Sequence, residues 1–164
     1  MPRLQEALDE NAQGCLVLSF EDVPFMDASF ADEVFAEIAA SRSRGEAPPR
    51  CLVLSNLDST SYDNLMMALT SRPVREPGLR NCVLPVRNAE GRVDLVGKWE
   101  DQVRATFECL RESERLTARE LANSQGLEIG AASTRLKVLF DLGLTCRREA
   151  RDERGRLYVY MSIG

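Results

Sequence analysis

The sequence predicts an α/β protein with two domains, an α/β sheet domain over residues 1–97 and a smaller domain over residues 98–164. Two nearly identical apolar runs, at 15–20 and 51–58, flank a helical pattern in the first part. The second part has helical patterns followed by two alternating segments. A chain of 164 residues is long enough for one ordinary domain or two small ones.

The first elements read as a strand, a helix and a second strand. The run 15–20 is short and continuously apolar, which is typical of a strand buried on both faces. Phe30, Val34 and Ile38 follow at spacings of four and predict an amphipathic helix, which the prolines and glycine of 43–50 end. The run 51–58 then resembles the first strand. Two such strands around a helix predict a parallel βαβ unit.

The sheet domain continues with a helix and a hairpin. Residues 61–71 carry an apolar stripe of Leu65, Ala68 and Leu69, which predicts a second helix. The segments 82–86 and 92–96 flank the sequence NAEG, a turn signal with glycine. The predicted order over residues 1–97 is therefore β-α-β-α-β-β.

The pattern after residue 97 is that of a winged helix. A helical stripe is formed by Trp99, Val103, Phe107 and Leu110. Thr117 and Glu120 form a capping-box pattern that begins a helix, and Gly126 ends it. A further helix over 129–142 precedes two strands, 144–149 and 157–163, around the arginine-rich turn RDERGR. A helix, a helix-turn-helix and a two-stranded wing, in this order, predict a winged helix.

Composition argues against most catalytic chemistry and indicates a cytoplasmic protein. The chain has no histidine, which excludes a Ser-His-Asp triad and histidine-ligated zinc, and it has neither a P-loop nor G-x-G-x-x-G. We therefore expect no enzyme, no cofactor and no metal. The first residues carry acidic side chains where a signal peptide is apolar, and no apolar run approaches membrane length.

The cysteines and the charge give further expectations. The five cysteines form no C-x-x-C pair, so we expect small, buried, reduced thiols. The net charge is −5, with 21 basic and 26 acidic residues. This charge gives no general attraction to nucleic acid, so DNA binding would depend on basic residues gathered on one face.

The C-terminal domain resembles ArsR/MarR-type winged-helix regulators over about 45 residues. The pattern of that family is matched at Leu116, Glu120, Leu121, Ala122, Gly126, Leu127, Ser133, Leu136, Leu139, Gly143, Leu144, Arg147, Gly155, Arg156 and Tyr158. The resemblance implies a winged-helix fold that binds duplex DNA. The metal-sensing cysteines and histidines of many ArsR relatives are missing here, so the resemblance implies no response to metals.

The N-terminal domain resembles a STAS-like domain, the fold of anti-sigma factor antagonists. The resemblance rests on the segment Phe20–Phe35, which contains the sequence SFADEVF, and on the runs 52–57 and 65–72. It implies an α/β sheet that binds a protein partner. In phosphorylated antagonists the phosphoserine directly follows an aspartate, but here Asp27 is followed by Ala28. We therefore expect Ser29 to be a helix N-cap and not a phosphosite.

Two alternative functions follow. The first is a DNA-binding transcriptional regulator that acts as a homodimer, with a protein partner bound through Asp27, Ser29 and Asp32. The second is a protein-interaction adaptor of a partner-switching pathway that does not bind DNA.

The candidate DNA contacts lie on the second winged-helix helix and on the wing. The helix should bury Ala132, Leu136 and Leu139, which leaves its opposite face for DNA or simply for solvent. The predicted contacts are Ser133, Thr134, Arg135, Lys137, Arg148, Arg151, Arg154 and Arg156. Tyr158 and Tyr160 share one face of the wing, where we expect packing on the body of the domain.

Overall fold

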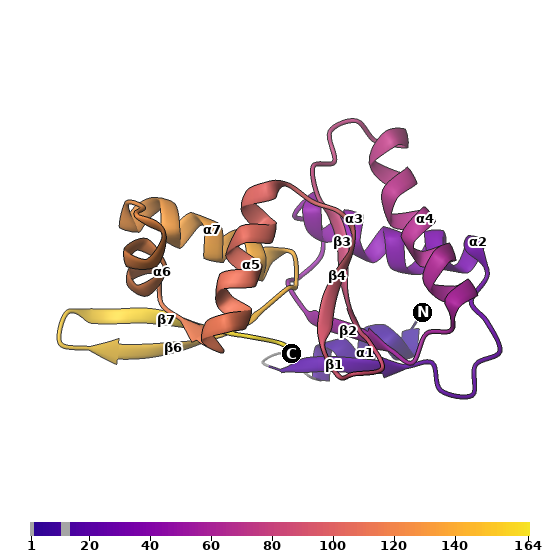
Figure 1. Ribbon diagram of the computed structural model, residues 1–164, viewed down its shortest axis with the longest axis horizontal. Coiled ribbons are helices and arrows are strands. Elements are labelled where there is room, and N and C mark those ends of the chain that lie inside the picture. Colours follow the sequence, from indigo (N-terminus) through magenta and orange to yellow (C-terminus); the bar gives the residue numbers. More distant parts are fainter. Residues whose placement is uncertain (1, 11–13) are drawn as a thin grey trace.

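The computed structural model describes residues 2–10 and 14–164 and shows a mixed α/β protein with two sheets (Figure 1). The larger sheet has the order β1-β2-β3-β4, formed by Cys15–Ser19, Cys51–Ser55, Cys82–Arg87 and Val93–Lys98. The first three strands run parallel, and β4 is antiparallel to β3. The predicted α/β class, the parallel unit and the hairpin at NAEG are confirmed.

The helices of this first half cover one face of the larger sheet. A continuous helical segment consists of α2 (Ala28–Phe30), the π-helical η1 (Ala31–Ala36) and α3 (Glu37–Ser43), and α4 spans Ser59–Arg75. One core joins these helices to the sheet through residues such as Phe35, Leu54, Leu65, Leu69 and Leu84. An additional helix, α1 (Pro2–Glu10), was not predicted, because its sequence has few apolar residues.

The C-terminal elements follow the predicted order. The helices are α5 (Asp101–Ser113), α6 (Ala118–Gln125) and α7 (Ile129–Asp141), and the short β5 (Arg115–Leu116) pairs with the hairpin formed by β6 (Cys146–Asp152) and β7 (Gly155–Met161). In Figure 1 this hairpin extends at the left, away from the larger sheet. The predicted six-residue turn is wrong, because Arg151 and Arg156 are paired strand residues and only Glu153 and Arg154 form the turn.

The second face of the larger sheet packs against the C-terminal elements. Cys51, Val53, Val83 and Val93 belong to the same core as Phe107 of α5, Leu136 of α7 and Ile163. Strand β2 is buried at every position, as the sequence predicted for a strand with two covered faces. Strand β1 has the same sequence but is half exposed, because it lies at the edge of the sheet. The prediction that 15–20 is buried on both faces is therefore wrong.

The cysteine prediction is also wrong in part. Cys15 and Cys51 are register partners on the parallel strands β1 and β2 and form a disulfide, with their Cα atoms 4.6 Å apart. Cys82 is a buried free thiol, and burial raises its pKa to about 12. Cys109 and Cys146 are free and only partly buried. Sequence spacing missed the disulfide because the contact depends on strand register.

Within the described residues, no helix combines the length and apolar character that crossing a membrane requires.

Candidate nucleic-acid interface

The two ends of helix α6 are fixed by local sequence signals. The Thr117 hydroxyl accepts a hydrogen bond from the Glu120 amide, and the Glu120 carboxylate accepts one from the Thr117 amide at 2.7 Å. This capping box confirms the predicted start of α6. Gly126 ends the helix in the left-handed conformation, with φ of 63°, where a glycine costs least.

Helix α7 buries one face and presents the other to solvent. Ala132, Leu136 and Leu139 are fully buried, as predicted from their spacing. Ser133 and Thr134 are exposed on the opposite side, and the Thr134 hydroxyl donates a hydrogen bond to the Gly130 carbonyl oxygen. The exposed part of α7 near its N-terminus therefore offers small polar side chains to a partner.

A hollow lies between the starts of α6 and α7 and the β6–β7 hairpin, with a volume of about 300 Å³. Among the predicted DNA contacts, Ser133 and Arg156 both line it. Arg119 at the start of α6 and Tyr158 of the hairpin line it too. Tyr158 is 44% exposed, whereas Tyr160 is buried, so the expected packing of both tyrosines on the body holds for Tyr160 alone.

Strand register divides the arginines of the hairpin between two faces. Arg151 lies directly opposite Arg156, so both side chains leave the same face. Arg148 pairs with Val159 and is three residues from Arg151 on the same strand. Because successive side chains alternate between faces, the Arg148 side chain points to the opposite face. Arg154 is in the turn between the strands. Of the four predicted arginines, Arg151 and Arg156 therefore share one face of the hairpin. Arg154 lies in the turn, and Arg148 lies on the opposite face.

Several of the predicted cationic contacts already have partners. Lys137 forms an ion pair with Asp141 at 2.5 Å, and Arg135 donates to the Gln125 side-chain oxygen at 3.2 Å. The Arg156 guanidinium donates two hydrogen bonds to Glu149, one of them at 2.7 Å. These partners lower the net positive charge that α7 and the hairpin present.

The exposed arginines without an ion-pair partner in the described part of the chain include Arg119, Arg148, Arg151 and Arg154. Arg119 was missed in the sequence, because it lies inside the capping-box segment, which we interpreted only as a helix signal. Arg147 has a different environment. Its guanidinium lies 3.9 Å from the ring centroid of Phe140 and 4.2 Å from that of Tyr158, a stacked position that fixes α7 to β7.

Lys137 lies apart from the hollow that Ser133 and Arg156 line. It borders a second cavity, together with Arg44 and Arg80 of the first half of the chain. The two ends of α7 therefore have different surroundings. Its first turns lie beside the hairpin, and its last turns lie beside the half of the protein that contains the larger sheet.

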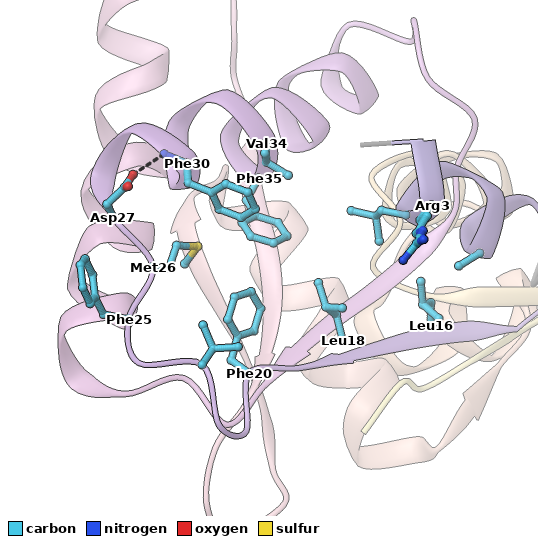
Figure 2. Close-up of a pocket in the computed structure, with 13 residues that line it drawn as sticks. Arg3, Leu16, Leu18, Phe20, Phe25, Met26, Asp27, Phe30, Val34 and Phe35 are labelled. Carbon is cyan, nitrogen blue, oxygen red and sulfur yellow. Dashed lines mark hydrogen bonds between the residues drawn. The ribbon is translucent and has the colours of Figure 1, made fainter.

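Two of the three candidate partner-binding residues of the first half, Asp27 and Asp32, have structural partners. The Asp27 carboxylate caps α2 by accepting a hydrogen bond from the Phe30 amide at 2.7 Å (Figure 2). The prediction that Ser29 is the N-cap is wrong, because the N-cap is Asp27, two residues earlier, and Ser29 lies exposed inside the helix. Asp32 forms ion pairs with Arg72 and Arg75 of α4, and the hydrogen bond with Arg75 lowers the pKa of its carboxyl.

An apolar pocket of about 630 Å³ opens beside Asp27. Leu16, Leu18 and Phe20 line it from β1 and the residue that follows, and Phe30 and Val34 from the helical segment (Figure 2). Phe25 and Phe30, at its rim, are 59% and 49% exposed. Large apolar side chains with this exposure are typical of a surface that binds a partner.

No group of three or more metal-ligating side chains is found in the described ranges, 2–10 and 14–164. Comparison with models of known protein families gives no match, and comparison with curated proteins gives none either.

Proposed function

We propose that the protein is a DNA-binding transcriptional regulator, in which residues 98–164 form a winged helix. Helix α7 would be the recognition helix and the β6–β7 hairpin the wing. The observation that carries the proposal is the hollow between them, where Ser133 and Arg156 come together with Arg119. Polar groups on a helix beside a cationic hairpin suit a major groove flanked by phosphates.

The contacts divide by position along α7 and the wing. Ser133 and Thr134 are exposed near the start of α7 and are the candidates for base edges. Arg119, Arg151 and Arg154 are exposed cations and would contact phosphates. Lys137 and Arg156 are held by Asp141 and Glu149, so we assign them weaker contributions.

The first half, in this proposal, is a STAS-like domain that binds a protein partner. The apolar pocket supports this role, because its rim exposes Phe25 and Phe30 next to the capped helix start at Asp27. An apolar segment of a partner protein is the occupant that suits it. The same observation favours the second candidate function, an adaptor that binds only proteins.

We further propose that the protein acts as a homodimer through the β1 edge. The apolar stripe of α5 packs inside its own chain, with Val103, Phe107 and Leu110 buried, and so is not available for a second copy. Among the described strands, β1 pairs with β2 alone, and it exposes Val17 at 41%. A Val17→Lys variant should then be monomeric in light scattering at tens of micromolar, while the unmodified protein is a dimer. A monomeric unmodified protein, with and without DNA, would contradict this.

Fluorescence anisotropy with a labelled random duplex tests the main proposal. We expect binding at low salt that weakens steeply as salt rises, because each neutralised phosphate adds about −0.9 to the slope of log K against log salt. Absence of binding to any genomic fragment at low salt, or a flat salt response, would favour the adaptor.

A further inference from the structure

Arg42 is an almost fully buried cation that has no carboxylate partner among the described residues. It lies on the last turn of α3 and is 3% exposed. Its Nη1 atom is buried and has no hydrogen-bond partner within the described residues. Burial lowers the pKa of its guanidinium to about 10. A buried, unpaired charge is costly, and proteins generally supply a counter-charge for one.

The guanidinium is held in place by the second half of the chain. Gly143, in the turn after α7, has φ of 71°, and a Cβ atom there would lie 2.9 Å from Arg42 Nη1 and 2.5 Å from the Arg50 carbonyl oxygen. Only glycine fits this close approach. Arg42 is therefore fixed between the two halves of the protein and is not a mobile surface side chain.

Arg42 lines a cavity of about 570 Å³ between α3 and α7. The other cations that line it are Arg44, Arg80 and Lys137, and the carboxylates are Glu100 and Asp141. Both carboxylates already face another cation: Asp141 pairs with Lys137 at 2.5 Å, and Glu100 with Arg80 at 3.4 Å. Arg44 is bound by Glu37, Glu46 and Glu76. Among the cations that line the cavity, Arg42 is thus the one that has no carboxylate partner in the described part of the chain.

We infer that this cavity binds a small polar molecule through an oxyanion, a phosphate or carboxylate group, that pairs with Arg42. Guanidinium donors match the oxygens of either group and form charge-assisted hydrogen bonds with them. Ser43, Asn81 and Gln102 line the same cavity and supply hydroxyl and amide groups for the rest of the molecule. Of the proposed DNA contacts, Lys137 alone lines this cavity, and ligand binding there requires no DNA.

Titration calorimetry and thermal unfolding of the full chain test the inference, with inorganic phosphate, ribose 5-phosphate and citrate as probes. Sodium chloride keeps the ionic strength constant. We expect at least one probe to bind and to raise the unfolding temperature. Arg42→Met should weaken that binding by about 10- to 100-fold, the size of a lost charge-assisted hydrogen bond.

Arg104→Met is the matched control, because Arg104 is an exposed arginine of α5, where its guanidinium lies 6.0 Å from the Trp99 ring centroid. It should bind the probes as the unmodified protein does. Arg42→Met should also be at least as stable as the unmodified protein without a probe, since it removes an unpaired buried charge. If Arg42→Met does not fold, Lys137→Met carries the test, and we expect it to bind at least threefold more weakly.

Two results would overturn the inference. One is that none of the three probes binds. The other is that Arg42→Met and Arg104→Met bind and respond to the probes equally, which would reveal a general ion effect. All measurements are made without DNA, so their failure is separate from a failure of the DNA-binding proposal.

Discussion

Glu149 and Arg156 join the two strands of the β6–β7 hairpin through two side-chain hydrogen bonds. These hydrogen bonds lower the pKa of the Glu149 carboxyl and raise that of the Arg156 guanidinium. The pair is therefore fully charged at neutral pH, and the carboxylate competes with any phosphate for Arg156. Within the hairpin, Glu149 therefore competes with the phosphates of the proposed DNA ligand for Arg156.

Glu149→Gln should strengthen binding to random duplex DNA at low salt. The substitution frees Arg156 for one further phosphate, so the slope of log K against log salt should become more negative by about 0.9. Anisotropy titrations at four salt concentrations measure this. Glu112→Gln, an exposed glutamate of α5, is the control and should change little. An unchanged slope in Glu149→Gln would show that Arg156 does not reach DNA.

Arg151→Ala and Arg154→Ala should each weaken binding to all duplex sequences and make the salt slope less steep by about one unit. Both side chains are exposed at the end of the hairpin, where the flanking phosphates would lie. Arg148→Ala is a matched control from the opposite face, and we expect a smaller effect. Equal losses for all three arginines would contradict the assignment by face.

Ser133→Ala and Thr134→Ala should change the preference among DNA sequences more than the overall affinity. Both residues are exposed near the start of α7, and neither carries a charge that would bind phosphate. Competition with a randomised duplex library measures the preference of each variant. A uniform loss of affinity with unchanged preference would assign these residues to the DNA backbone instead.

Asp27→Ala should lower the free energy of unfolding by about 1 kcal/mol, because it removes the N-cap of α2. Ser29→Ala should change it by less than about 0.5 kcal/mol, because Ser29 is exposed and does not cap the helix. Urea unfolding of both variants gives the comparison. The reverse order of the two losses would show that Ser29 is the true cap.

Reduction of the Cys15–Cys51 disulfide should destabilise the protein by at most about 4 kcal/mol, the loop entropy expected for a sequence separation of 36 residues. The double variant Cys15→Ser, Cys51→Ala should lose a similar amount and no longer respond to dithiothreitol. Cys109→Ser, which changes a free and partly buried cysteine, is the control. An unfolding midpoint that dithiothreitol leaves unchanged would contradict the prediction.

The sequence predicted the elements whose signals are local. Thr117 and Glu120 marked the start of α6, and the spacing of Ala132, Leu136 and Leu139 gave the buried face of α7. The turn around Arg154 was placed too broadly, because the charged residues of β6 and β7 carry no apolar alternation. Ser29 was chosen as the cap because serine is a common N-cap, although Asp27 is equally suited and lies at the true helix start.

The features that depend on distant segments could not be predicted. The disulfide requires Cys15 and Cys51 to be register partners, and strand register is not readable from the two identical runs alone. The ion pair of Glu149 with Arg156 depends on hairpin pairing. The environment of Arg42 depends on Gly143, about one hundred residues later in the chain, and so appears only when both halves are in place.

The larger sheet has apolar side chains on both faces, and the two halves of the chain each cover one of them. Removal of residues 98–164 would expose Cys51, Val53, Val83 and Val93 to water, which would leave an aggregation-prone apolar surface on the remaining fragment. The protein should accordingly unfold in a single cooperative transition, with neither half behaving as a free-standing module. The helices over one face and α7 over the other pack on the same sheet, a rigid connection that a flexible tether between domains would not provide.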